Sequence, residues 1–299
     1  MKKSLLVATL LAAAFAAQAQ TTDTLKKIKD TGTVVMGVRG SFGALSYTLG
    51  EGKYAGFHVE LCQRAIDDIG KQLGKHLDVK YQEVTSANRI PLVQNGTVDI
   101  ECGSTTNNEA RAKDVAFAHT AYVEEVRILT KVNSGIKGIA DLNGKSVATT
   151  TGTTSVQLLR KHERATGVDF KEVFGKDHAD SFQLLESGRA DAFVMDGQIV
   201  AGLASKAKTP ADYHIVGEVL SVEPIAIMVR KDDPAFLAAV NKTIDGMEKS
   251  GEIAKLYDKW FMQPIPPTNT KVGLPPSEAT KAAWKNPNSN PTEAYMAKK

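Results

Sequence analysis

The stretch FHVELCQRAIDDIGKQLGKHLDVKYQEVTSANRIPLVQNGTVDIEC, residues 57–102, alternates between helical and extended patterns. Apolar side chains at positions 57, 61, 65, 66, 69 and 73 recur at helical spacing, which predicts a helix over residues 57–73. Residues 79–84 and 98–102 have the pattern of strands, and a short helix over residues 88–94 lies between them. This alternation favours an α/β fold with mostly parallel sheets.

The same pattern continues on both sides of this stretch. Upstream, we expect a strand over residues 33–38 and a hairpin over residues 46–54. Downstream, a second α/β block is expected, with its strands at 146–149 and 192–195 and its helices at 154–166 and 180–187. The sequence therefore predicts two α/β lobes.

Two extended runs, residues 126–131 and 221–229, lie between these blocks. They predict two segments that cross between the lobes and form a hinge. Helices are expected over residues 234–249 and in an aromatic segment that ends at Phe261. The segment 264–299 is rich in Pro, Asn and Lys and predicts a surface tail with one short helix near residues 277–284.

The chain has 299 residues, 42% of them hydrophobic, which is typical of a globular protein of about two domains. A basic start, an apolar run over residues 5–17 and the sequence Ala17-Gln18-Ala19 predict a secretory signal peptide with cleavage after Ala19. That run is too short to span a bilayer. Beyond residue 19 the chain has 35 basic and 34 acidic residues, so its charge does not indicate binding to nucleic acid.

The two cysteines, Cys62 and Cys102, are expected to form a disulfide because a secreted chain meets an oxidising compartment. Cys62 lies early in the helix at 57–73 and Cys102 ends a strand, and in a parallel layer helix starts and strand ends share one edge. Two buried thiols are the alternative. The chain has no CxxC, HxxxH or HExxH motif, so we expect neither a metal site nor a cofactor.

Polar residues gather in the turns between predicted strands and helices, which is where ligands bind in open α/β sheets. The first lobe contributes Arg39, Ser86, Arg89, Ser104, Thr106 and Arg111, and the second contributes Thr153, Thr154, His178 and Asp196. Taken singly, the hydroxyl residues and Asp196 are ordinary helix caps, and a lone arginine is ordinarily solvated. Their joint placement at helix N-termini, with three arginines, indicates an anion site.

The same residues do not make a convincing enzyme. Ser104, His178 and Asp196 are residue types of a catalytic triad, but the serine lies in ECGST and not in a GxSxG elbow. The sequence TTTGTTS has no GK[ST] and therefore is not a nucleotide P-loop. The sequence favours binding over catalysis.

Several motifs resemble the periplasmic glutamate/aspartate-binding proteins of ABC transporters, in solute-binding protein family 3. The resemblance runs from residue 25 to 267 and rests on VTSANRIPLVQNGTVDIECGSTTNN (84–108), TTGTTS (150–155), KDHADSF (176–182), LESGRADAFVMD (185–196), VRKDDP (229–234) and DKWFMQPIPP (258–267). It implies a type II periplasmic-binding fold. The implied boundaries are a signal peptide over 1–19, lobe one over 20–127 and 225–270, lobe two over 128–224, and a tail over 271–299.

The resemblance also implies roles for the turn residues. Ser104, Thr106 and Arg111 would hold an α-carboxylate, Thr153 and Thr154 would donate to the ligand, and Asp196 would accept from its α-ammonium. The side-chain carboxylate would be surrounded by Arg39, Ser86, Arg89 and His178. Family members often have Pro-Phe before the first hairpin's Ser/Glu-Tyr pair. Here the stretch is Ala44-Leu45-Ser46-Tyr47, so the aromatic residue that packs on the ligand is either Phe42 or Tyr47.

Charge counting agrees with an acidic ligand. One arginine and one aspartate suffice for any zwitterion, so the further arginines and His178, expected to be protonated or donating, call for an additional anion. We therefore expect a monomeric periplasmic protein that binds L-glutamate or L-aspartate by hinge closure and serves a membrane permease. A cyclohexadienyl dehydratase-like enzyme on the same fold, or a receptor-coupled sensor, is the alternative.

Overall fold

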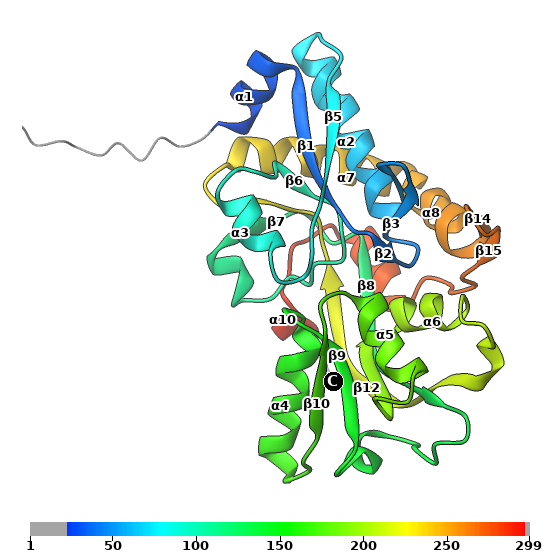
Figure 1. The fold of residues 1–299 in the computed structure, drawn as a ribbon. Coiled ribbons are helices and arrows are strands. Elements are labelled where there is room, and N and C mark those ends of the chain that lie inside the picture. Colours follow the sequence, from blue (N-terminus) through cyan, green and yellow to red (C-terminus); the bar gives the residue numbers. More distant parts are fainter. Residues whose placement is uncertain (1–22, 297–299) are drawn as a thin grey trace, which may run out of the picture.

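Two five-stranded sheets, one in each lobe, form the framework of the molecule (Figure 1). The computed structural model describes residues 23–296, and the predicted signal peptide lies outside them.

The sheet of lobe one has the order β5-β1-β6-β13-β7. Its strands are β1 (Thr33–Val38), β5 (Asp78–Glu83), β6 (Ile100–Glu101), β7 (Val115–Phe117) and β13 (Met228–Arg230). The sheet of lobe two has the order β10-β9-β11-β8-β12. Its strands are β8 (Tyr122–Lys131), β9 (Ser146–Thr150), β10 (Lys171–Gly175), β11 (Ala192–Asp196) and β12 (Tyr213–Ile225).

Both sheets are mixed. β1 pairs in parallel with β5 and β6, and β9 pairs in parallel with β10 and β11. β13 runs antiparallel to its neighbours in lobe one, as β8 does in lobe two. The prediction of mostly parallel sheets therefore missed one antiparallel strand in each lobe, contributed in both cases by a segment of the chain next to a crossing.

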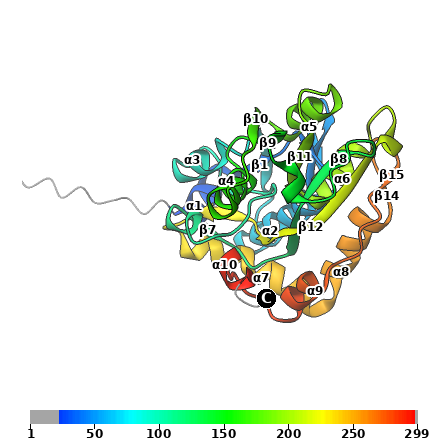
Figure 2. The same cartoon turned by 90° about the horizontal axis from the view of Figure 1, so that it is seen from below.

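Helices cover the faces of the two sheets (Figures 1 and 2). Lobe one has α1 (Thr24–Thr31), α2 (Phe57–Leu73), α3 (Arg89–Gln94), α7 (Pro234–Ser250), α8 (Glu252–Tyr257) and the short turns η1 (Arg111–Lys113) and η4 (Asp258–Met262). Lobe two has α4 (Thr154–Thr166), α5 (His178–Glu186), α6 (Gly197–Ala204), η2 (Ile139–Leu142) and η3 (Pro210–Asp212). Within residues 23–296, none of the helices is long and apolar enough to cross a membrane.

The ends of α2 and α4 show why the sequence folds locally as it does. α2 buries its apolar stripe in the core and ends at Gly74, whose φ is 67° and whose N–H donates to Gly70 O. α4 ends at Gly167 in the same left-handed conformation, with φ 74°. Glycine adopts this conformation without a steric penalty, so both helices stop where the sequence predicted.

The two crossing segments are longer than the sequence suggested. β8 and β12 pair antiparallel over both of their ends, with Glu223 opposite Glu124, and they run between the two lobes (Figure 1). Residues 126–131 and 221–229 were predicted as extended runs. The first lies within β8, whereas the second covers the end of β12 at Ile225 and continues into β13 of the lobe-one sheet. The register shifts between Val216 and Ser221, where the strand pattern in the sequence is interrupted.

A disulfide joins Cys62 on α2 to Cys102, the residue after β6, with a Cα–Cα distance of 6.3 Å. This confirms the predicted pairing. Both cysteines are fully buried in the main core of lobe one. The bond therefore fixes the end of β6 to the helix behind it.

The C-terminal segment packs against lobe one and the crossing strands rather than forming a loose tail (Figure 2). It contains β14 (Pro264–Ile265), β15 (Thr270–Lys271), α9 (Glu278–Lys285) and α10 (Thr292–Met296). The predicted helix near 277–284 is α9. Trp284 Nε1 donates to Ala121 O at 2.7 Å, and Thr280 Oγ1 accepts from Val123 N–H at 3.1 Å, so α9 is held to the start of β8. A third small sheet, β2 (Ser41–Phe42), β3 (Ser46–Gly50) and β4 (Lys53–Ala55), lies in lobe one.

Candidate functional site

The predicted residues lie at the carboxyl ends of strands in both sheets, where the two lobes meet. Lobe one supplies Arg39 after β1, Ser86 and Arg89 after β5, Ser104 and Thr106 after β6, and Arg111 at the start of η1. Lobe two supplies Thr153 and Thr154 after β9, His178 at the start of α5, and Asp196 at the end of β11. All of them are buried except Arg111 and Thr154, which are half-buried.

Contacts across the two lobes bring these turns together. Arg39 Nη2 donates to Ser86 Oγ at 3.1 Å within lobe one and to Asp177 Oδ1 at 3.1 Å in lobe two. Asp177 Oδ2 also accepts from Ser41 Oγ at 2.6 Å. Because Arg39 is fully buried, the carboxylate of Asp177 offsets part of the cost of removing the guanidinium from water.

A second contact between the lobes involves Arg111. Its Nη1 donates to Thr106 O at 3.0 Å and its Nη2 donates to Gly152 O at 3.1 Å. Gly152 has φ +82°, and a Cβ there would lie 2.8 Å from Ala87 Cα. The loop before α4 therefore needs glycine to approach the backbone of the loop before α3.

Arg89 is a buried positive charge whose side chain has nitrogens left unpartnered in the described part of the chain. It is 2% exposed, and its Nε and Nη1 have no hydrogen-bond partner among the described residues. Burial, followed by repulsion from Arg111, lowers its pKa to about 9. A buried guanidinium without an acceptor is strongly unfavourable, so this position calls for an anion.

His178 is neutral in this arrangement. Burial, followed by the nearby positive charge of Arg39, holds the pKa of His178 well below its usual value. His178 Nδ1 is 2.7 Å from Thr150 Oγ1, and Nε2 is 3.4 Å from Arg39 Nη2. The sequence predicted a protonated or donating imidazole facing a ligand. Burial beside Arg39 opposes protonation of the ring, and donation to a ligand by the neutral ring stays a prediction.

Asp196 is a buried carboxyl group of the site with one oxygen left unpartnered in the part of the chain that the structure describes. It is 1% exposed, and its Oδ1 has no hydrogen-bond partner among the described residues. Burial and the repulsion of Glu223 raise its pKa to about 7, although Arg89, Arg111 and Arg39 oppose that shift. An unpaired buried carboxylate attracts a cation, so the site presents one anion-seeking and one cation-seeking position.

The family model for bacterial extracellular solute-binding proteins, family 3, matches residues 34–263. The chain belongs to this family. It is 45% identical over 290 residues to the L-glutamate/L-aspartate-binding protein of Pseudomonas aeruginosa, covering 96% of each chain. It is 44% identical over 266 residues to the glutamate/aspartate import solute-binding protein of Escherichia coli, covering 89% of this chain and 88% of that one.

Among solved structures, this family 3 protein resembles an ancestral amino acid-binding protein that is a precursor of cyclohexadienyl dehydratase. The TM-score is 0.68 at 30% identity, over 80% of this chain and 99% of that chain. The fold is the two-lobed α/β fold of type II periplasmic-binding proteins. Both curated relatives are named as binding proteins and not as enzymes, in agreement with the binding role expected of this chain.

Two threonines of the predicted site donate their hydroxyl hydrogens to other groups of the protein. Thr153 Oγ1 donates to Thr150 O at 2.8 Å, which closes the loop before α4. Thr154 Oγ1 donates to Glu223 Oε2 at 2.8 Å. The resemblance implies that both residues donate to a ligand through hydroxyl and backbone N–H. In the structure both hydroxyls donate to protein oxygens, and the contact of these residues with a ligand stays a prediction. Ser104 makes no side-chain hydrogen bond within the described residues.

Sequence reasoning missed Glu223 and Asp177 as part of the site. Glu223 lies on β12, not in a turn, and it is 2% exposed. Its signal in the sequence is a lone acidic residue inside the apolar run SVEPIAIMV, residues 221–229. Asp177, which directly precedes His178, was not among the predicted residues, although its carboxylate accepts a hydrogen bond from Arg39.

Of the two aromatic residues predicted to pack on a ligand, Phe42 and Tyr47, only Tyr47 has a side chain that the structure describes. Tyr47 is 3% exposed, its hydroxyl donates to Pro266 O at 2.7 Å, and its ring contacts Trp260 edge-on. Tyr47 is therefore engaged within lobe one and the C-terminal segment. The side chain of Phe42, the other candidate, lies outside the described part of the structure.

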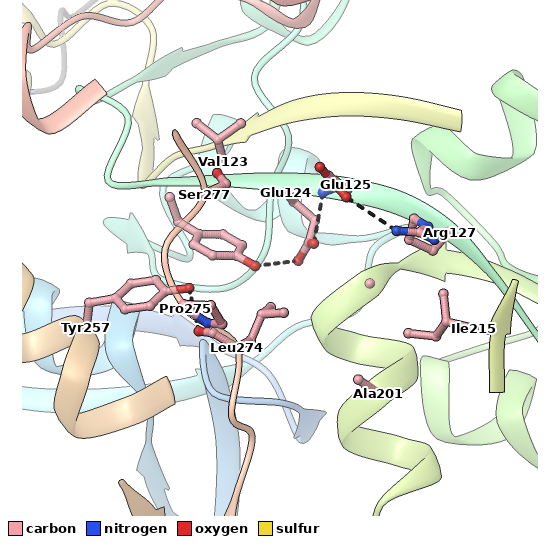
Figure 3. Close-up of a pocket in the computed structure, with 12 residues that line it drawn as sticks. Val123, Glu124, Glu125, Arg127, Ala201, Ile215, Tyr257, Leu274, Pro275 and Ser277 are labelled. Atoms are coloured by element: carbon pink, nitrogen blue, oxygen red, sulfur yellow. Dashed lines mark hydrogen bonds and ion pairs between the residues drawn. The ribbon is translucent and has the colours of Figure 1, made fainter. Parts of the chain in front are cut away.

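A separate pocket of about 180 Å³ lies between β8, α6 and the segment Leu274–Ser277, and none of the predicted site residues lines it (Figure 3). Glu124 lies in its wall, where Tyr122 Oη donates to Glu124 Oε2 at 3.1 Å and Glu125 N–H donates to Oε1 at 2.9 Å. Burial and the nearby Asp196 raise the pKa of Glu124 well above its usual value. Within residues 23–296, no group of His, Cys, Asp and Glu side chains is placed to hold a metal ion.

Proposed function

We propose that this protein captures L-glutamate or L-aspartate outside the cytoplasm and delivers it to the membrane permease of an ABC transporter. The observation that carries this proposal is Arg89, a buried guanidinium with two unpartnered nitrogens beside Arg39 and Arg111. One arginine is enough for the α-carboxylate of any amino acid. The remaining positive charge is matched by a ligand with a second carboxylate.

The two ends of the ligand have separate partners. Arg39, Ser86 and Arg89, with His178, surround the side-chain carboxylate, and Arg111 with Ser104 holds the α-carboxylate. Asp196, whose Oδ1 is unpartnered, accepts from the α-ammonium. The names of both curated relatives support this ligand class.

Binding proceeds by closure of the lobes, because the partners come from both of them. We place lobe one at residues 20–127 and 225–270, lobe two at 128–224 and the C-terminal tail at 271–299, with the hinge in β8 and β12.

The protein acts as a periplasmic monomer, and its signal peptide is cleaved after Ala19. Intact mass of the exported protein tests the cleavage: a start at Gln20 supports it, and any other start contradicts it.

Isothermal titration calorimetry with glutamate, aspartate, glutamine and asparagine tests the ligand class. The protein is first unfolded, dialysed and refolded so that no carried-over amino acid competes. We expect the two acidic amino acids to bind at micromolar concentration or tighter, which corresponds to about 8 kcal/mol or more, and their amides to bind far more weakly. Equal binding of glutamine and glutamate, or no binding of either acid, would overturn the proposal.

A further inference from the structure

Glu223 connects the two lobes from the crossing strand β12 (Tyr213–Ile225). Its Oε2 accepts from Thr106 Oγ1 at 2.7 Å and from Thr154 Oγ1 at 2.8 Å. Thr106 follows β6 in lobe one, and Thr154 is the first residue of α4 in lobe two. One buried carboxylate oxygen therefore links a site residue from each lobe.

These two bonds fix the direction of both hydroxyls. A threonine hydroxyl has one hydrogen and two lone pairs, and an ionised carboxylate can only accept. Each threonine uses its hydrogen on Glu223, so it presents only lone pairs to a group bound beside it. Lone pairs attract an N–H donor and repel a carboxylate oxygen.

Asp196 adds a third acceptor nearby. Val126 of β8 pairs with Asp196 of β11 on one side and with Ser221 of β12 on the other, so Asp196 and Glu223 lie on the two strands that flank β8. Glu223 is also the charge that most strongly raises the pKa of Asp196. Asp196 Oδ1 has no hydrogen-bond partner among the described residues. An ammonium group has three N–H donors, and Asp196, Thr106 and Thr154 offer three acceptors.

We propose that Glu223 is a positioning residue that turns the hydroxyls of Thr106 and Thr154 into acceptors for the ligand's α-ammonium. The protein thereby discriminates amino acids from analogues that lack the amino group. The inference rests on the proposed function, because it takes the ligand to be glutamate or aspartate. The direction of these hydrogen bonds is the reverse of the one that the resemblance implies, in which Thr106 holds the α-carboxylate and Thr154 donates to the ligand.

The test compares the affinities of L-glutamate and of glutarate, which is glutamate without its amino group, by calorimetry at one pH. Glu223→Met removes the acceptor, so both hydroxyl hydrogens become free to turn toward a carboxylate. We expect this variant to lower the preference for glutamate over glutarate by about 10- to 100-fold. Glu223→Gln keeps an acceptor oxygen and should recover part of that preference.

Three further variants serve as controls for this result. Glu218→Gln changes an exposed glutamate on the same strand and should leave the preference at the wild-type value. Thr154→Val removes one of the two hydroxyls, should also lower the preference, and serves if Glu223→Met does not fold by circular dichroism. Thr154→Ser should restore it.

The possible failures are distinguishable. If the wild-type protein binds neither glutamate nor aspartate, the proposed function fails, and this inference fails with it. If the wild-type protein prefers glutamate but Glu223→Met and Thr154→Val keep the same preference over glutarate, the proposed function stands and the role of Glu223 is wrong. A uniform loss of affinity for both ligands also contradicts it, since that is the result of a merely structural role.

Discussion

The two lobes contribute opposite charges to the site. Lobe one provides the three arginines, Arg39, Arg89 and Arg111, and one buried acid, Glu101, which favours the charged forms of Arg89 and Arg111. Lobe two and the crossing strand β12 provide Asp177, Asp196 and Glu223, so the net charge of the two sides is still opposite. A ligand with carboxylates alone would be held by one lobe. A dicarboxylic amino acid has both signs of charge, so it makes favourable contacts with both lobes and stabilises their approach.

The lobes also differ in how firmly their turns are supported. In lobe one, the turn that contains Ser104 is held by the disulfide at Cys102 and by His58, whose Nδ1 is 2.6 Å from Gly103 O. Burial lowers the pKa of His58 to about 4, so the ring is neutral and its N–H can donate. In lobe two, the described turns are held by hydrogen bonds such as Thr153 to Thr150. We therefore expect the ligand to dock first on lobe one, where the turn at Ser104 is anchored by a covalent bond.

The largest effect should come from removing a lobe-one charge. Arg89→Met leaves the ligand's side-chain carboxylate without its main partner, and we expect glutamate affinity to fall by about 3–5 kcal/mol, which is roughly a hundredfold to a few thousandfold. Glutamine should lose much less, so the glutamate/glutamine ratio narrows. Arg111→Met is the matched control, because both ligands share the α-carboxylate and should weaken alike. An unchanged ratio in Arg89→Met would remove that residue from the side-chain subsite.

Removing a lobe-two charge should weaken binding and stabilise the fold. Asp196→Asn loses the partner of the α-ammonium, and we expect amino-acid affinity to fall by about 2–5 kcal/mol. The folded pKa of Asp196, about 7, lies above its ordinary value of 3.8, so its ionised form destabilises the fold as pH rises between those values. Without ligand at pH 8, Asp196→Asn should therefore melt higher than wild type. A lower melting temperature for this variant would contradict the assigned environment.

Breaking the disulfide tests the rigidity of lobe one. Cys62 and Cys102 are 40 residues apart in sequence, and the double variant Cys62→Ser/Cys102→Ser should lose about 2–4 kcal/mol of unfolding free energy. Thermal and urea denaturation measure this loss. Because the charges of the site are unchanged, the glutamate/glutamine ratio should persist in protein that remains folded. A loss of that ratio would mean that the disulfide also sets the charge geometry.

The smallest effect is the pH dependence of binding. An ammonium beside Asp196 favours its ionised form, so binding should release a proton near pH 7, and affinity should fall by up to about tenfold per pH unit below 7. The groups around Asp196 are Arg39, Arg89 and Arg111, which favour ionisation, and Glu223 and Glu124, which oppose it. Calorimetry in two buffers of different ionisation enthalpy counts the protons. No proton release at pH 6.5, or an unaltered pH slope in Asp196→Asn, would refute the linkage.

Much of the fold could be predicted from local patterns. β1, α2 and α4 begin and end at the predicted residues because apolar periodicity and a left-handed glycine act within a few neighbouring residues. The extended run predicted over residues 221–229 covers the end of β12 and most of β13, but the break between these two strands and the first half of β12 were missed. Their pairing depends on strands that are distant in sequence, and the first half of β12 is partly exposed, so it has little apolar signal.

The residues of the candidate site also fall into those that local sequence patterns predict and those that depend on distant parts of the chain. Residues in strand-to-helix turns could be found because the topology of α/β sheets places those turns at one edge. Glu223 could not be found in this way, since it lies within strand β12 and not in a turn, and its partners come from two other parts of the chain. The neutral state of His178 was also beyond prediction, because it depends on Arg39 from the other lobe.

A crystal structure of the protein with L-glutamate tests the central claim most directly, namely that the two lobes hold opposite charges of one ligand. We predict that the side-chain carboxylate lies between Arg39 and Arg89, the α-carboxylate lies on Arg111, and the ammonium lies within hydrogen-bonding distance of Asp196. A glutamate whose ammonium faces the arginine side, or one bound by lobe one alone with Asp196 uninvolved, would contradict the account.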